Sequence, residues 1–186
     1  MRNVVRTAEG REANKKVLEE HVRTFLDING LEGADFDDTP ARVARLWDTF
    51  LNVEKPALHA FPTSNDELIV PKQYVLWGYC PHHLIPIRYT FKVGYIPRNK
   101  ALGLSKFVRY SRYLLTTLPL QEDLPCLITD ALEEVLEPMG VGCIVEGWHL
   151  CMVARGVEQQ GSTVVTSSMK GLLLHSQTAR DEFLRA

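Results

Sequence analysis

Apolar residues in the N-terminal part of the chain recur at helical spacing and predict two amphipathic helices. The first spans about residues 11–28 and ends at the Asn-Gly pair that follows, a common stop signal. The second begins at Thr39, a suitable N-cap, and carries Pro40 at the first helical position, where proline is favoured. Residues 52–73 contain three prolines and no sustained period, so a long loop is predicted there.

The period changes to two in the middle of the chain. Apolar residues alternate with others over residues 85–95, which predicts a strand with one buried face. Helical spacing returns over residues 107–118 and 124–136, and alternation of two returns over about residues 141–153. The run STVVTSSM that follows is the expected hairpin partner of this last strand.

A short helix over about residues 175–184 completes the order helix, helix, strands, helix, helix, strands, helix. Strand pairs on either side of a helix pair favour an antiparallel sheet with the helices on one face, which is the α+β class. A doubly wound parallel sheet would need strict alternation of strand and helix, which this order lacks. We therefore expect an N-terminal helical region and loop over residues 1–73 and a second domain over residues 74–186.

Composition limits the classes of function. The 186 residues are 45% hydrophobic and 24% charged with a formal net charge of -2, which is typical of a soluble globular protein. No stretch approaches the roughly 20 consecutive apolar residues that span a membrane, and the charged N-terminus is unlike a secretory signal. A cytoplasmic protein that does not bind membranes is expected. The near-neutral charge also argues against a nucleic-acid partner, which needs a clustered basic excess.

Candidate metal ligands occur in two segments that are far apart. Cys80 and His83 have the spacing C-x-x-H, at which a turn can place a thiolate and an imidazole on one ion. His149 and Cys151 are two positions apart in the predicted strand, so we expect their side chains on one face. Ligands from Cys80, His83 and Cys151 with a water would match an open catalytic zinc site.

The residues leave two questions open at this site. His149 is either a fourth ligand or a neighbour of the metal that handles protons, and spacing does not separate these roles. The alternative for Cys151 is a buried strand cysteine that binds nothing. Cys126 and Cys143 lie on apolar stripes without a histidine partner, so both are expected to be small core residues.

A cluster of basic residues marks a candidate anion site. Ser105, Lys106 and Arg109 occur where a Gly-Leu turn opens a helix, so backbone amides and two cations could bind a phosphate. Arg155 follows the segment of His149 and Cys151 and adds a cation near the expected metal. The alternative is a solvated helix face.

Gln121 and Glu122 open the next predicted helix. A carboxylate that accepts two N–H groups suits the amide and amine edge of guanine. A first-turn Glu is also favoured by the helix dipole without any ligand. The residues taken alone favour this second reading.

Several motifs together resemble the GTP cyclohydrolase I family, over about residues 38–184. The motifs are DTPARVARLWDTFL, CPHHLIPI with VGYIP, GLSKFVR, LQEDL, EGWHLCMVARGV and STVVTSS. The resemblance implies the tunnelling fold, in which two strands, two helices and two strands follow one another, and a toroidal homodecamer with active sites at subunit boundaries. It also implies zinc-dependent hydrolysis of GTP to 7,8-dihydroneopterin triphosphate and formate, a step that opens pterin and folate synthesis.

The resemblance implies a role for each candidate residue. The zinc ligands would be Cys80, His83 and Cys151, and the proton-handling catalytic residues would be His82 and His149. The triphosphate would be held by Ser105, Lys106, Arg109 and Arg155, and the guanine edge by Gln121 and Glu122. Zinc lowers the pKa of its bound water to about 7, which suits a hydrolytic attack on C8 of guanine.

One residue departs from the family's pattern. Members usually carry Glu between the cysteine and the paired histidines, whereas this chain has Pro81, which restricts the backbone and removes a carboxylate. The alternative is therefore a zinc-containing paralogue that serves as a scaffold, or one that acts on another purine or pterin. The retained histidines and phosphate-site residues favour the enzyme, because a scaffold needs none of them.

Overall fold

The structure is a computed structural model that describes residues 7–71 and 73–186. The chain falls into two compact units, one ending at Glu54 and the other beginning at Lys55. In the described residues, no helix combines the length and the apolar character that a membrane crossing requires.

Two helices form the first unit, α1 (Ala8–Ile28) and α2 (Thr39–Leu51), as the periodicity predicts. The hydroxyl of Thr7 caps α1 by accepting a hydrogen bond from the backbone of Gly10 at 3.1 Å. Arg11 joins the helices by donating to both oxygens of Asp48, at 3.1 and 2.9 Å. This guanidinium holds the pKa of Asp48 below its usual value.

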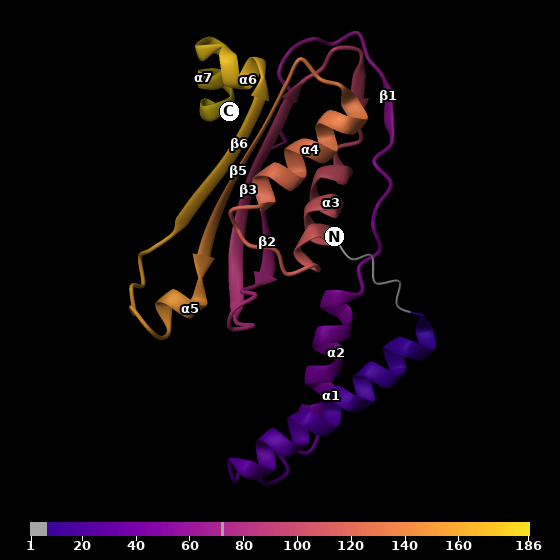
Figure 1. Cartoon of the computed structure of the whole chain (residues 1–186), viewed down its shortest axis with the longest axis vertical. Helices are drawn as coiled ribbons and strands as arrows, with labels where there is room; N and C mark the ends of the chain where they lie inside the picture. Colours follow the sequence, from indigo (N-terminus) through magenta and orange to yellow (C-terminus); the bar gives the residue numbers. More distant parts are fainter. Residues whose placement is uncertain (1–6, 72) are drawn as a thin grey trace. The chain divides into compact units, whose positions relative to one another are not determined.

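The second unit is built on a four-stranded antiparallel sheet, which confirms the predicted α+β class (Figure 1). Its strand order is β2 (Tyr74–Tyr79), β3 (Pro86–Ile96), β5 (Gly140–His149) and β6 (Val164–Gly171). The expected strand over residues 85–95 and the expected hairpin between β5 and β6 are both present. The apolar residues that alternate along β3 form one buried face, as predicted; Ile87, Tyr89 and Phe91 lie on it.

The segment predicted as a long loop contains a short β-strand and an isolated β-bridge. Its residues 60–62 form β1 (Ala60–Pro62), which pairs with β4 (Lys100–Leu102) in a separate two-stranded sheet. Ile69 also forms an isolated antiparallel bridge with Tyr95. These pairings depend on residues more than 25 positions away along the chain, so local periodicity carried no sign of them.

Helices α3 (Ser105–Leu115) and α4 (Leu124–Leu136) cover one face of the four-stranded sheet, in front of the strands in Figure 1. Their apolar residues close the main core; the buried ones are Phe107, Leu114, Leu115, Leu124, Ile128, Leu132 and Leu136. Cys143 of β5 is buried as predicted. The prediction that Cys126 is a core residue was wrong, because Cys126 is exposed. At about 100° per residue, it faces away from the stripe that starts at Leu124.

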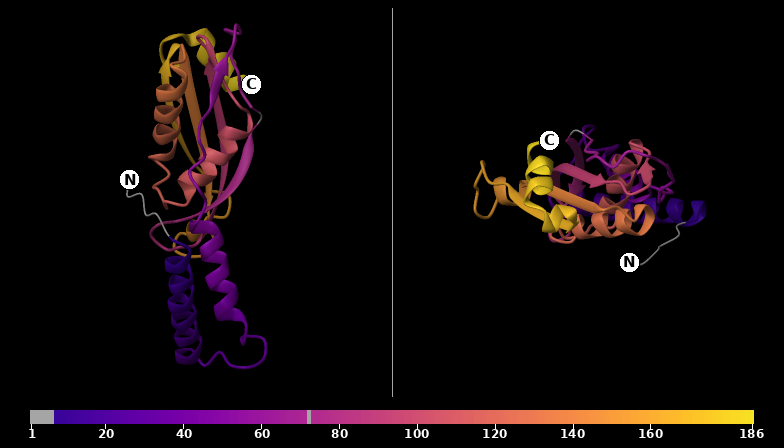
Figure 2. Two further views of the ribbon diagram at one scale, coloured as in Figure 1. Left: turned by 90° about the vertical axis from the view of Figure 1, so that its right-hand side faces the viewer. Right: turned by 90° about the horizontal axis from the view of Figure 1, so that it is seen from above.

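The C-terminal helices α6 (Leu172–His175) and α7 (Gln177–Arg185) pack at the end of the sheet where β3 ends and β5 begins (Figure 2). They lie against the opposite face from α3 and α4, whereas the sequence predicted helices on one face only. Gly94 and Gly142 are register partners, and a Cβ on either would lie 3.1 Å from the ring of Phe183. The absence of two side chains thus makes the socket for this buried phenylalanine.

The single helix predicted over residues 175–184 is divided at Ser176, which caps α7 by accepting a hydrogen bond from Ala179. Lys92 of β3 helps to hold α7: its Nζ atom donates to the carbonyl oxygen of Leu184 at 2.8 Å and lies 5.7 Å from the ring centre of Phe183.

We predict that Phe183→Ala lowers the free energy of unfolding by about 3–5 kcal/mol, because it removes a fully buried aromatic side chain from a rigid socket. Urea denaturation followed by circular dichroism measures the change. Phe61→Ala is the matched control: this phenylalanine is 52% exposed, so the loss should stay within about 0.5 kcal/mol. Equal losses in the two variants would contradict the role given to Phe183.

Candidate metal centre and active site

The turn between β2 and β3 presents Cys80 and His83. The backbone N–H of Cys80 donates to the carbonyl of Ile85 at 2.9 Å, and that of Leu84 donates to the carbonyl of Cys80 at 2.8 Å. Leu84 has a φ of 54°, which lets the chain reverse within so few residues. As predicted for the C-x-x-H spacing, the turn brings Sγ of Cys80 to 3.7 Å from Nδ1 of His83. His82 lies beside them, with its Nδ1 also 3.7 Å from that sulfur.

Cys151 also lies near Cys80 and His83, but its local structure differs from the predicted strand. Strand β5 ends at His149, and Cys151 lies in the single helical turn α5 (Leu150–Val153). The prediction that His149 and Cys151 project from one face of a strand was therefore wrong. Pairing stops because His149 faces Ile87 at the start of β3, and β6 pairs with β5 only as far as Gly147. Beyond that point no strand of the described residues continues the ladder.

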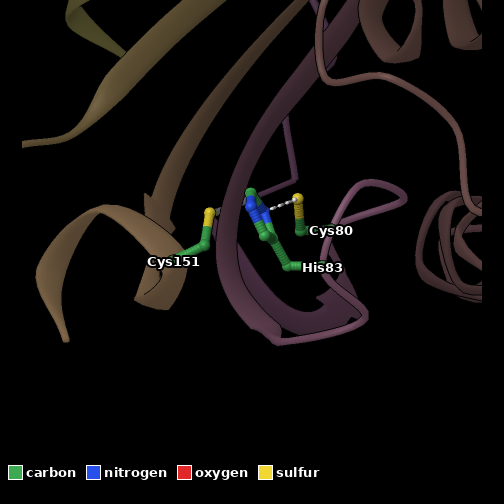
Figure 3. A group of neighbouring side chains, drawn as sticks. All are labelled: Cys80, His83 and Cys151. Atoms are coloured by element: carbon green, nitrogen blue, oxygen red, sulfur yellow. Dashed lines mark hydrogen bonds between the residues drawn. The ribbon is translucent and has the colours of Figure 1, made fainter. Parts of the chain in front are cut away.

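The three predicted ligands converge (Figure 3). One donor atom from each of Cys80, His83 and Cys151 lies within 4.8 Å of the other two. Within the described residues these three form the group, and His149 is not one of its members. Cys80 is buried, Cys151 is partly buried and His83 is exposed, so the group opens to solvent on one side.

The donor set fits a zinc ion. Two thiolates and one imidazole are typical zinc ligands, and two donors of one tetrahedral zinc lie about 3.5–3.8 Å apart. The 3.7 Å separation of Cys80 and His83 is in that range. Burial raises the pKa of the Cys151 thiol, and the neighbouring Cys80 raises it further, against the opposing charge of Arg155. A cation would relieve both effects, because metal binding requires and stabilises the thiolate.

His149 lies two residues before Cys151, at the end of β5, and is held by Gln121. Its Nε2 atom is 2.6 Å from Oε1 of Gln121, a side chain that is only 4% exposed. Burial lowers the pKa of His149, and the charge of Glu122 works in the opposite direction. Glu122 therefore lies near this histidine, at the metal end of the sheet. The predicted contact of Gln121 with a guanine edge stays a prediction. In the structure its amide bonds within the chain, to Val145, Val164 and His149.

Tyr89 belongs to this environment, and sequence reasoning did not single it out. Its buried ring meets the His149 ring edge to face, with centroids 6.2 Å apart and an interplanar angle of 83°. In the sequence it is one of several alternating apolar or aromatic residues of a strand. Only the register, which sets Tyr89 opposite Gly147, shows that it borders the site.

The predicted phosphate residues of α3 are at the other end of the sheet. Phe107, near the start of α3, stacks on Tyr95 with centroids 6.0 Å apart. Leu115, at the end of the helix, reaches Gly78, close to the metal ligands. Tyr95 is eight positions from Ile87 along β3, which corresponds to about 26 Å. The described chain therefore does not bring Ser105, Lys106 and Arg109 to its own metal centre.

Arg155, unlike the α3 cations, lies near the three donors, because its charge lowers the pKa of Cys151. Lys106, Arg109 and Arg155 share one property: none is within ion-pair distance of an acidic residue that the structure describes. These cations are therefore available to an anion. The chain thus offers a metal end with one nearby cation and, separately, a basic helix start.

Fold and site together define an α+β protein with an open three-donor group that could hold a metal ion. The family model for GTP cyclohydrolase I matches residues 18–186. The GTP cyclohydrolase 1 of Aquifex aeolicus (strain VF5) is 37% identical over 177 residues, which cover 92% of this chain and 96% of the relative. That of Gloeobacter violaceus is 44% identical over 176 residues, covering 88% and 80%. The chain therefore belongs to the GTP cyclohydrolase I family and is an enzyme of this class.

The structure is also similar to the crystal structure of the archaeosine synthase QueF-Like in the apo form. The TM-score is 0.45 at 18% sequence identity, and the match covers 59% of this chain and 97% of the other. A likeness this distant carries no information about function.

We predict that Cys151→Ser weakens the binding of a divalent metal ion by more than about tenfold, because one of the three donors to the ion is lost. Titration with Co²⁺, followed by its thiolate charge-transfer absorption, measures the affinity. Cys126→Ser is the matched control, because it removes an exposed cysteine that is not one of the three converging donors, and it should bind like the unmodified chain. Undiminished binding by Cys151→Ser would rule out the proposed donor set.

Proposed function

We propose that this protein is a zinc-dependent GTP cyclohydrolase I that hydrolyses GTP to 7,8-dihydroneopterin triphosphate and formate, at the entry to tetrahydrofolate and other pterin synthesis. The observation that carries the proposal is the convergence of Cys80, His83 and Cys151 within 4.8 Å in a member of this family. These donors come from segments almost 70 positions apart, and a fold without a shared ligand has no need to bring them together.

The proposed site uses the ligands and the residues around them. Cys80, His83 and Cys151 would hold the zinc ion, which when bound lowers the pKa of water to about 7 and so supplies a nucleophile at neutral pH. His82 lies beside Cys80 and His149 lies two residues before Cys151, and both would carry protons to and from the ring nitrogens of guanine.

Other residues would bind the parts of GTP that do not react. The carboxylate of Glu122 is exposed and would accept N–H groups from the guanine edge. The triphosphate would be bound by Ser105, Lys106, Arg109 and Arg155. Binding energy from this remote group would position the base at the metal centre and hold it there for attack.

We propose that the active site is completed between subunits. The separation of the α3 cations from the metal centre supports this, because one chain by itself lacks a full set of phosphate ligands near its donors. The order of two strands, two helices and two strands in the main sheet supports the tunnelling fold for residues 74–186, preceded by the helical region and loop of residues 1–73. The outer strands β2 and β6 could pair with other copies, in keeping with a homodecamer.

Incubation of the zinc-loaded protein with GTP tests the function. We expect GTP to be consumed with the release of formate and the appearance of the pterin absorption band. A chelator should abolish the reaction and added zinc should restore it, because the nucleophile depends on the metal. His83→Ala should lose activity together with metal. A protein that binds zinc tightly and leaves GTP unchanged would instead favour the scaffold alternative.

Mixing two inactive variants tests the shared site. His83→Ala lacks a metal ligand and Lys106→Ala lacks a phosphate ligand, so each alone should be nearly inactive. If each site combines a metal centre from one copy with cations from another, random mixed oligomers should regain about a quarter of full activity. Co-expression followed by the GTP assay measures the rescue. No rescue from verified mixed oligomers would mean that both residues act within one chain.

A further inference from the structure

The amide of Gln121 has only one orientation that its surroundings allow. Its Nε2 atom donates to the carbonyl oxygens of Val145 at 3.2 Å and Val164 at 2.7 Å. Carbonyl oxygens only accept hydrogen bonds, so the NH₂ group must face them and the amide cannot be flipped. Its Oε1 atom therefore faces His149.

This orientation decides which nitrogen of His149 carries the proton. The amide oxygen is only an acceptor, so the Nε2 atom at 2.6 Å must be an N–H donor. In the neutral ring the other nitrogen, Nδ1, then has the free lone pair. The carboxamide oxygen occupies space that only a glycine leaves open, because an ideal Cβ at Gly147 would lie 2.1 Å from Oε1.

Tyr89 restricts the same imidazole from a second direction. Tyr89 is 1% exposed, and its ring meets the ring of His149 edge to face, with the two ring centroids 6.2 Å apart. Tyr89 itself fills space left by Gly78, where a Cβ would lie 2.8 Å from its Cε2 atom. A rotation of the His149 ring would break the bond to Gln121 and also disturb this packed contact.

We propose that Gln121 and Tyr89 are positioning residues that hold His149 in its Nε2–H form, so that Nδ1 is the nitrogen that exchanges protons with the substrate. The part of this statement that concerns the substrate rests on the proposed function. The tautomer does not, because it follows from contacts within the chain.

The tautomer can be measured without GTP. The zinc-loaded full chain is labelled with ¹⁵N-histidine and studied by solid-state NMR at a pH where the ring is neutral, and the signals of His149 are identified by their loss in His149→Ala. We expect a protonated Nε2 and an unprotonated Nδ1. A proton on Nδ1 would overturn the proposal whatever the enzyme's activity. A proton on Nε2 in a protein that leaves GTP unchanged would support the positioning role and count against the proposed reaction only.

Kinetics of matched variants test the consequence. Gln121→Met keeps the length of the side chain but removes the oxygen that accepts from His149. Because His149 would then no longer be held in position to exchange protons, we expect kcat to fall about 10- to 100-fold with little change in KM. A higher KM at constant kcat would mean that Gln121 binds substrate, and would overturn its positioning role. The control Thr166→Val removes only the bond from the Thr166 hydroxyl to the backbone oxygen of Gln121, and should leave kcat and the tautomer unchanged.

Tyr89 has its own pair of variants. Tyr89→Phe keeps the ring that contacts His149, so kcat and the ¹⁵N signals should stay close to those of the unmodified chain. Tyr89→Leu removes the aromatic edge, and we expect mixed tautomers of His149 and a lower kcat. If Tyr89→Phe lost as much activity as Tyr89→Leu, the hydroxyl would be the functional group and the proposed ring contact would be wrong.

Discussion

The antiparallel pairing of β3 with β5 is the constraint on which the site depends. Its register sets His149 opposite Ile87, so the chain leaving β5 emerges beside the turn that carries Cys80 and His83. A shift by one residue would turn every side chain of β5 to the other face of the sheet. Tyr89 and His149 would then no longer share the face that packs against the helices, and Cys151 would be displaced from its partners.

Burial and charge act together at this end of the sheet. Cys80 is buried and Cys151 partly so; burial raises the pKa of the Cys151 thiol and the neighbouring Cys80 raises it further, and a bound cation would oppose both effects. The same partial burial favours the uncharged ring of His149. The candidate metal centre therefore combines thiols whose ionisation a cation would favour with a histidine that Gln121 holds two residues before Cys151.

The sheet also separates functions along its length. One end carries the metal donors, whereas the other carries the start of α3 and, on the opposite face, the socket of Phe183. About 26 Å of strand lies between Ile87 and Tyr95, too far for one small substrate to bridge. Assembly of several copies would resolve this, since it allows the basic end of one chain to meet the metal end of another.

The sequence by itself was sufficient for the α+β class and for most helices and strands, because periodicity is a local property, and it singled out Cys80, His83 and Cys151, whose donor atoms converge. It failed at the β1 pairing and at the local structure of Cys151, because both depend on where distant strands pair. It also failed at Cys126, where the position on the helix surface was misjudged. Only the tertiary structure could show that Gln121 and Tyr89 enclose His149, or that Lys106 is remote from Cys80. Such relations depend on register and on which faces meet, and neither is written in the spacing of residues along one segment.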